Sequence, residues 1–158
     1  MGTYEKKECC PRFNPEPWDG KEIPLDGRLF IKDHVRSIFH IPINFGSVMR
    51  KNLSLIEAAG AKKADMIVLS DEKSMWGSDI FLETAKDVPA VIMARISGKY
   101  LAKVFEGPYR NMGKWIKEMK LFVESKGLKF GKLYFYYTTC PKCAKEYGKN
   151  YVVILAQI

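Results

Sequence analysis

From residue 28 onward, the spacing of hydrophobic residues changes from that of a strand to that of a helix and back, and it does so twice. Alternation with a period of two is typical of a half-buried strand, whereas hydrophobic residues three and four positions apart indicate an amphipathic helix. The first such segment covers residues 28–87, and the second covers residues 88–158. Each segment has the pattern of strand, helix, strand, strand, which indicates one structural unit present twice.

The first unit begins with partial alternation in residues 27–45, which predicts a strand. Hydrophobic residues then recur at helical spacing over 46–59, so a helix with one buried face is expected there. Two short strands follow at 66–70 and 78–85, and the turn between them contains Trp76. The second unit repeats this order with a long strand over 90–107.

A helix ending at Gly127 and a hairpin formed by residues 132–139 and 150–158 complete the second unit. Because each sheet needs its apolar face covered, we expect an α+β domain with a curved antiparallel sheet backed by two helices. The units would be related by a pseudo-twofold axis, with a ligand cleft between the repeats. Residues 28–158 would form this single domain.

Residues 1–27 are rich in proline and glycine and are expected to form an extended arm that is laid over the core, with Trp18 as its anchor. No apolar run approaches the roughly 20 residues of a membrane span, and no signal peptide is evident, so a cytoplasmic location is expected. The net charge is +8, but the basic residues are dispersed. We therefore expect neither specific nucleic-acid binding nor membrane binding.

The four cysteines fall into two close pairs, Cys9–Cys10 and Cys140–Cys143. The second pair has the spacing of half a zinc site, and the first pair would supply the remaining ligands if the arm returned to that loop. Adjacent cysteines fit one tetrahedral ion poorly, and no second CxxC is present. A loop with reduced thiols is therefore favoured over a zinc site, and no cofactor is expected.

Two segments carry a family resemblance: the "EGPY" turn at 106–109, which leads into a helix, and "YFYYTTCPKC" at 134–143. With the order of elements around them, they resemble the GyrI-like small-molecule-binding domains over residues 28–158. The resemblance implies a pseudo-twofold pair of units and binding of bulky, aromatic, often cationic molecules. Members fused to a DNA-binding domain regulate transcription, and some stand-alone members hydrolyse reactive cyclopropane-bearing natural products.

The N-terminal "CCPRFNPEPWDGK" and the loop "CPKCAKEYGKNY" are similar to a subgroup of stand-alone members labelled hydrolases. Sensor members of the family commonly carry an acidic residue on the penultimate strand. Phe135 occupies that position in this chain, which weighs against cation binding there.

Strand alternation separates Tyr134 and Tyr136 from Phe135 and Tyr137 on opposite faces of one strand. One of these pairs is expected to line the cleft, where aromatic faces suit planar organic ligands. The alternative is an aromatic strand covered by the helices or the arm. Further candidate ligand-binding residues are Tyr109, Trp76, Phe81, Asp79, Met93 and Tyr151.

Two carboxylates, Glu106 and Glu83, are candidate catalytic bases, because a partly shielded carboxylate can activate water. Glu106 lies at a strand-to-helix joint, where it would also interact favourably with the helix dipole, and Glu83 would otherwise be a solvated surface acid. No Ser-His-Asp or Cys-His arrangement is visible in the sequence.

Three hypotheses follow from these observations. The first is a stand-alone protein that binds hydrophobic or aromatic small molecules for sequestration, sensing or multidrug resistance. The second is a hydrolase that detoxifies reactive cyclopropane-bearing compounds. The third is a zinc-stapled interaction protein built around the two cysteine pairs.

Overall fold

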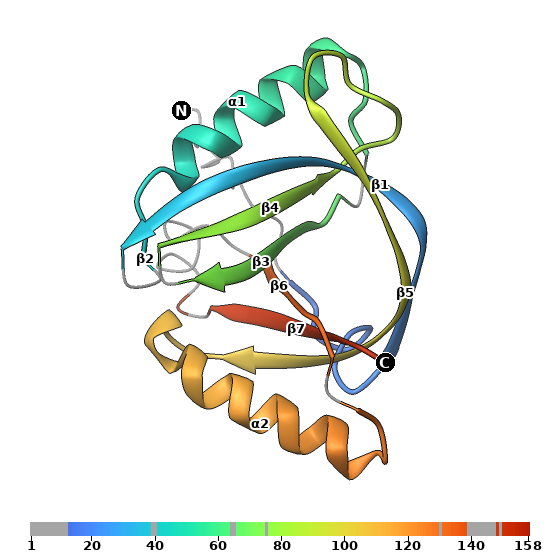
Figure 1. The fold of residues 1–158 in the computed structure, drawn as a ribbon, viewed down its shortest axis with the longest axis vertical. Coiled ribbons are helices and arrows are strands. Elements are labelled where there is room, and N and C mark those ends of the chain that lie inside the picture. Colours follow the sequence, from blue (N-terminus) through green and yellow to red (C-terminus); the bar gives the residue numbers. More distant parts are fainter. Residues whose placement is uncertain are drawn as a thin grey trace, which may run out of the picture.

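The computed structural model describes residues 13–38, 41–63, 66–74, 76–129, 131–138, 148 and 150–158. Within these residues the chain has an α+β fold, with six antiparallel strands that pair in a closed ring and two α-helices outside it (Figure 1). A seventh, two-residue strand pairs antiparallel with the end of the first strand. The predicted α+β class, with an antiparallel sheet and two helices, is therefore confirmed.

The elements follow the order predicted from the hydrophobic periods. The first half contains β1 (Glu22–Ile38), β2 (Ile41–Pro42), α1 (Phe45–Ala58), β3 (Val68–Ser74) and β4 (Gly77–Glu83). The second half contains β5 (Ile92–Glu106), the 3-10 turn η1 (Tyr109–Asn111), α2 (Met112–Ser125), β6 (Leu133–Tyr137) and β7 (Tyr151–Gln157). One boundary matters for function, because β3 runs on to Ser74 through residues that were not predicted to form a strand.

The sheet closes on itself instead of remaining an open curved surface. Strand pairing runs from β1 through β4, β3, β6, β7 and β5, and β5 pairs with β1 again. The β1–β5 ladder extends from Glu22–Leu101 to Lys32–Ile92, whereas β3 and β6 meet through only Leu69–Tyr136 and Ser70–Phe135. Closure removes the sheet edges that would otherwise offer unpaired backbone groups.

A bulge bends β1 where it crosses β5. Leu25 pairs with Gly98, but the next pair is Arg28–Ile96, so the extra residue lies on β1. Gly27 has a φ of 64° there, a conformation that glycine adopts without steric cost. The irregularity is thus in β1, where Asp26 and Gly27 lie opposite Ser97 of β5, and it increases the bending that closes the ring.

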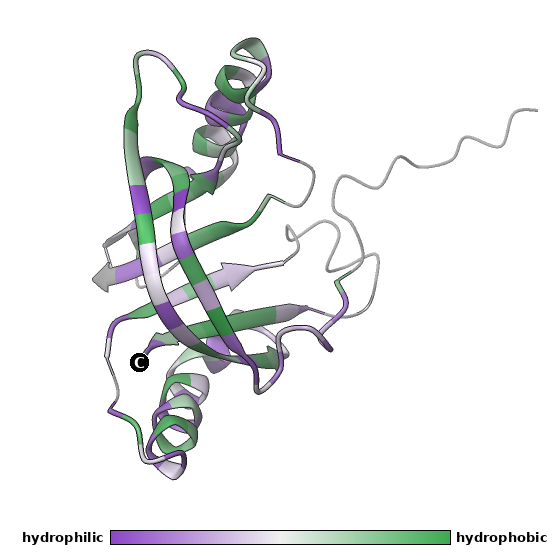
Figure 2. Cartoon of the chain, turned by 90° about the vertical axis from the view of Figure 1, so that its right-hand side faces the viewer, coloured by the Kyte–Doolittle hydropathy of each residue, from purple (hydrophilic) through white to green (hydrophobic). Residues whose placement is uncertain are grey.

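The inside of the ring is a packed core. Phe30, Phe81, Tyr134 and Tyr100 form a chain of ring contacts, with successive centroids 6.4, 5.8 and 5.8 Å apart. Leu69 and other buried aliphatic residues from the same strands fill the space around these rings. Hydropathy alternates along the strands, as Figure 2 shows for β1 and β5, because inward and outward residues alternate.

Each helix covers the outside of one half of the ring. Helix α1 buries Val48 and Ile56 against outward residues of β1 and β4, and α2 buries Trp115 and Met119 against β5 and β7. Figure 1 shows the helices at opposite ends of the molecule, with β3 and β6 between them. The seam between β3 and β6 therefore lies between the two helices.

The N-terminal segment from residue 13 follows β5 and covers part of the ring. Hydrogen bonds of 2.9 Å join Ala102 to Gly20 and Lys21, which continues the β1–β5 pairing upstream of β1. Trp18 packs on Tyr136 with the ring centroids 5.3 Å apart. The expected role of Trp18 as an anchor is confirmed, although β1 already begins at Glu22, inside the range expected to form the arm.

Candidate functional site

Three side chains meet on the outside of the β3–β6 seam: Ser70, Glu72 and Tyr137. Strand alternation determines their direction, because Leu69 packs inside the ring while Val68 packs against the α1 side. On β6, Tyr137 packs with the residues beneath α2. Ser70, Glu72 and Tyr137 therefore share the outer face between the helices, and we call this group the seam site.

The carboxylate of Glu72 is the centre of the seam site. Tyr137 donates from its hydroxyl to Glu72 Oε1 at 2.7 Å, and Ser70 Oγ donates to the same oxygen at 3.0 Å. Ser70 is 2% exposed, whereas Glu72 and Tyr137 are half-buried. Among the described residues, no lysine or arginine forms an ion pair with Glu72.

This arrangement holds a carboxylate in place with neutral donors only. A carboxylate has about four lone-pair sites, so two hydrogen bonds leave room for a water molecule or a ligand group. A positioned carboxylate that is not neutralised by a cation can accept a proton from water. The seam site is therefore chemically suited to general-base catalysis.

Sequence reasoning missed Glu72 because residues 71–74 were assigned to a turn. The structure extends β3 through these residues and pairs Asp71 with Asp79 on β4. The alternation of Val68, Ser70 and Glu72 with Leu69 and Asp71 was the available signal, but the charged run after it was read as the end of the strand.

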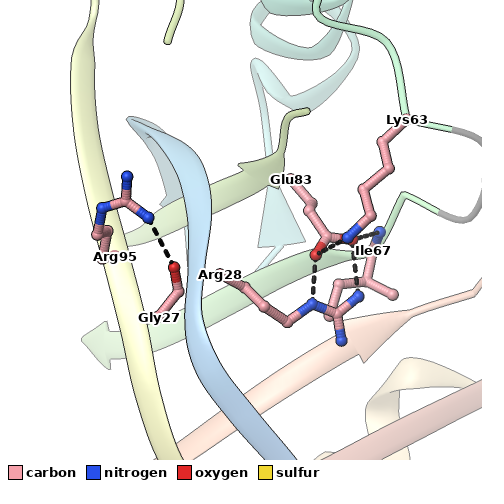
Figure 3. Close-up of polar contacts among 6 residues, drawn as sticks. All are labelled: Gly27, Arg28, Lys63, Ile67, Glu83 and Arg95. Carbon is pink, nitrogen blue, oxygen red and sulfur yellow. Dashed lines mark hydrogen bonds and ion pairs between the residues drawn. The ribbon is translucent and has the colours of Figure 1, made fainter. Parts of the chain in front are cut away.

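The predicted base Glu83 lies in a different environment, at one end of the ring. Its side chain is 1% exposed and forms a two-pronged ion pair with Arg28 and a 2.9 Å bond with Lys63. The backbone N–H of Ile67 also donates to it at 3.3 Å (Figure 3). Burial alone would raise the pKa of Glu83, but the two cations outweigh burial and lower this pKa.

Asp79 and Phe81, both predicted to bind ligand, belong to the inward-facing row of β4. Phe81 is part of the packed core. Asp79 pairs in register with Asp71 near the rim, where it contacts His34 Nδ1 at 3.1 Å and Asp71 contacts Lys132 at 3.3 Å. These acids are therefore held in ion pairs at the rim and do not join the seam site.

The aromatic residues of β6 are divided among separate places. Tyr134 is buried in the ring, and Phe135 is buried beneath α2. Tyr136 packs under the N-terminal segment, next to Phe13, which also contacts Tyr151 with centroids 5.8 Å apart. Of the four predicted aromatic residues on this strand, Tyr137 is the one placed in the seam site.

The remaining predicted residues do not gather at one place. Glu106 is exposed at the end of β5, in register with Tyr151, and Trp76 is 57% exposed between β3 and β4. Met93 packs on the core beneath α1. The backbone of Tyr109 begins η1, and its side chain is outside what the structure describes.

Cys9, Cys10, Cys140 and Cys143 lie outside the described residues, so the zinc hypothesis stays a prediction. Within the part of the chain that is described, no group of three or more histidines, cysteines or carboxylates is placed to hold a metal ion. Within the same residues, no helix has the length and hydropathy needed to cross a membrane.

Comparison with known proteins gives the chain a family. A family model described as bacterial hydrolase matches residues 2–158. The chain belongs to the bacterial hydrolase family. No curated protein matches this member of the family.

A solved structure shares the fold of this bacterial hydrolase family member. It is the crystal structure of an uncharacterized conserved protein from Listeria innocua, 14% identical, with a TM-score of 0.61. The match covers 86% of this chain and 90% of that chain. At this identity, the likeness shows a common fold alone.

Proposed function

We propose that the protein hydrolyses a small electrophilic molecule at the seam site. The observation that carries this proposal is the Glu72 carboxylate, held at 2.7 and 3.0 Å by two hydroxyls without a paired cation in the described residues. Membership of a family described as bacterial hydrolase supports the reaction class. The proposal moves the catalytic base from Glu106 and Glu83 to Glu72.

In the proposed mechanism, Glu72 accepts a proton from a water molecule. For a cyclopropane conjugated to a carbonyl group, the water oxygen forms a bond to a ring carbon while one ring bond breaks. The electron pair of that bond moves into the conjugated carbonyl group, and the proton held by Glu72 then returns to the product. Ring strain supplies much of the driving force, so positioning and one general base are sufficient.

The environment of Glu83 argues against the same role there. Its two cations stabilise the charged form and lower the pKa, which makes a weaker base. Moreover, a water molecule would have to replace a partner of a carboxylate that is already bonded to Arg28, Lys63 and Ile67. Glu106 is exposed, so it lacks the shielding that a base at this strand end would need.

We also infer that the two halves are copies of one unit with a GyrI-like arrangement. The pairings support this, because β1, β3 and β4 correspond to β5, β6 and β7 in both order and partners. The β3–β6 seam then lies at the boundary between the copies, where the family resemblance places a ligand. Each copy would contribute one side of the site, Glu72 from the first and Tyr137 from the second.

Binding without turnover is the second candidate function. The ring of Tyr137 lies next to a carboxylate that forms no ion pair with a lysine or arginine among the described residues, a combination that suits planar or cationic organic molecules. The Glu72 side chain would then neutralise the ligand instead of activating water. Titration of planar aromatic dyes against tryptophan fluorescence would reveal a saturable site, and Glu72→Gln should weaken the binding of cationic dyes more than that of neutral dyes.

The test of hydrolysis uses a cyclopropane-bearing alkylating substrate and detects the water adduct by mass spectrometry. We expect turnover by the wild type and a loss of about 100-fold or more in Glu72→Gln. Glu106→Gln makes the same chemical change at an exposed position and should retain the wild-type rate. Equal rates in wild type and Glu72→Gln would exclude the proposed mechanism, and saturable binding without any adduct would favour the binding function.

A further inference from the structure

A hollow lies outside the ring, where the chain passes from β4 to β5. Its volume is about 460 Å³, and it is separate in sequence from the seam site. Thr84, Lys86 and Asp87 of the β4–β5 connection form part of its lining, together with Lys63 and Arg95. Three of these five side chains are cationic, which makes the hollow basic.

The two cations that are not committed to Glu83 are Arg95 and Lys86. Arg95 donates from Nη1 to the carbonyl oxygen of Gly27 at 3.0 Å, which holds the guanidinium in place (Figure 3). A guanidinium has five N–H donors, so most of them remain for another acceptor. In the described part of the chain, neither Arg95 nor Lys86 forms an ion pair with a carboxylate.

Thr84, which also lines the hollow, has a buried hydroxyl that lacks a hydrogen-bond partner. The residue is 4% exposed, and its Oγ1 has no partner among the described residues. The backbone N–H of Thr84 donates to the carbonyl oxygen of Leu29 at 2.9 Å, so the unmet hydrogen bond is that of the side chain. A buried hydroxyl without a partner is unfavourable, and a ligand acceptor that reached it would remove this penalty.

We propose that this hollow binds an oxyanion, with phosphate or an organic phosphate monoester as its ligand class. Arg95 would bind two phosphate oxygens through its planar fork, Lys86 would add charge, and Thr84 would donate its hydroxyl hydrogen. Lys63 adds positive potential from its position beside Glu83. Asp87 is the carboxylate in the lining, and its charge opposes the anion.

The test is titration of the full chain with inorganic phosphate and with a simple phosphate monoester, followed by two-dimensional NMR at low ionic strength. We expect saturable shifts in residues 84–87 and a loss of about 10-fold or more in affinity in Arg95→Ala. Lys120→Ala removes an exposed positive charge from α2 and serves as the matched control. Its affinity for phosphate should equal that of the wild type.

Two further variants separate a built site from general attraction to a basic protein. Thr84→Val keeps the shape of the side chain and removes the hydroxyl, so phosphate affinity should fall several-fold while the far-UV spectrum stays unchanged. Asp87→Asn should raise the affinity, because it removes the opposing charge. Tighter binding of the monoester than of inorganic phosphate would identify an organic phosphate as the ligand, and the reverse would identify free phosphate.

The proposal is overturned if neither phosphate compound gives saturable shifts, or if Arg95→Ala and Thr84→Val both bind as the wild type does. It is also overturned if Lys120→Ala weakens binding as much as Arg95→Ala does. The result is independent of hydrolysis at the seam site, because Glu72→Gln should leave phosphate binding unchanged.

Discussion

Glu72 and Glu83 lie on adjacent strands of one ring, but the structure gives them opposite surroundings. Glu83 belongs to the inward-facing row of β4, where its carboxylate is buried and paired with the partly exposed side chains of Arg28 and Lys63. Glu72 faces outward from β3, is half-buried, and accepts hydrogen bonds from the hydroxyls of Ser70 and Tyr137. The carboxylate of Glu83 is thus paired with two cations, whereas the carboxylate of Glu72 is held by hydrogen bonds from two neutral hydroxyls.

These different surroundings predict that one carboxylate contributes to stability and the other to catalysis. A buried carboxylate needs its cations, because an unpaired charge in the interior is costly, and those cations also weaken it as a base. A half-buried carboxylate that accepts hydrogen bonds from two hydroxyls keeps free lone pairs for a water molecule or a ligand group. We therefore expect changes at Glu83 to affect folding and changes at Glu72 to affect turnover.

The largest effect on stability should come from Glu83→Gln. This change leaves Arg28 and Lys63 without their carboxylate. Breaking a fully buried ion pair costs about 3–5 kcal/mol of unfolding free energy, and because both cations are partly exposed we expect a loss at the lower end of that range, about 3 kcal/mol. Urea unfolding measures the loss. The matched variant Glu72→Gln should lose less than about 1 kcal/mol, since the amide oxygen still accepts from both hydroxyls. Similar losses in the two variants would remove the contrast between the carboxylates.

The dependence of stability on pH should show the same contrast. The pKa of Glu83 in the folded chain is lowered from its ordinary 4.5, so the stabilisation is fully present above about pH 4.5 and is lost as pH falls through the folded pKa. The Glu83→Gln variant lacks this pH-dependent stabilisation. The difference in unfolding free energy between wild type and variant should therefore narrow below pH 4.5, and a constant difference down to pH 3 would contradict the assignment.

Tyr137→Phe tests the other carboxylate and should have an intermediate effect. It removes a 2.7 Å hydrogen bond to a half-buried carboxyl group, so we expect a loss of about 1–2 kcal/mol in unfolding free energy. Turnover should fall because Glu72 loses one of the donors that orient it. If stability falls and turnover stays at the wild-type level, Tyr137 is a structural residue and the seam site is not catalytic.

The smallest effect should come from Glu106→Gln. Glu106 is exposed at the end of β5, and surface substitutions of this kind usually change the unfolding free energy by less than about 0.5 kcal/mol. Its turnover should match that of the wild type under the same conditions. A strong loss of turnover with unchanged stability would instead restore Glu106 as the base and count against Glu72.

Local patterns made much of the fold predictable. The helices α1 and α2 followed from apolar spacing, and the division of Tyr134 and Tyr136 from Phe135 and Tyr137 followed from strand alternation, as the two packing clusters confirm. These features depend on residues close together in the chain. The candidate site was less predictable, because Tyr137 was one of several aromatic candidates and Glu72 was assigned to a turn.

By itself, the sequence determined the order of elements and which residues share a face of each strand or helix, since both depend on the geometry of neighbouring residues. The tertiary structure decided which residues each face contacts. It closed β1 onto β5, placed Arg28 on a carboxylate 55 positions away, and brought Tyr137 to Glu72 across the seam, 65 positions apart. Such pairings depend on the closure of the whole ring, and for that reason only the folded chain distinguishes the carboxylate that stabilises from the carboxylate proposed to react.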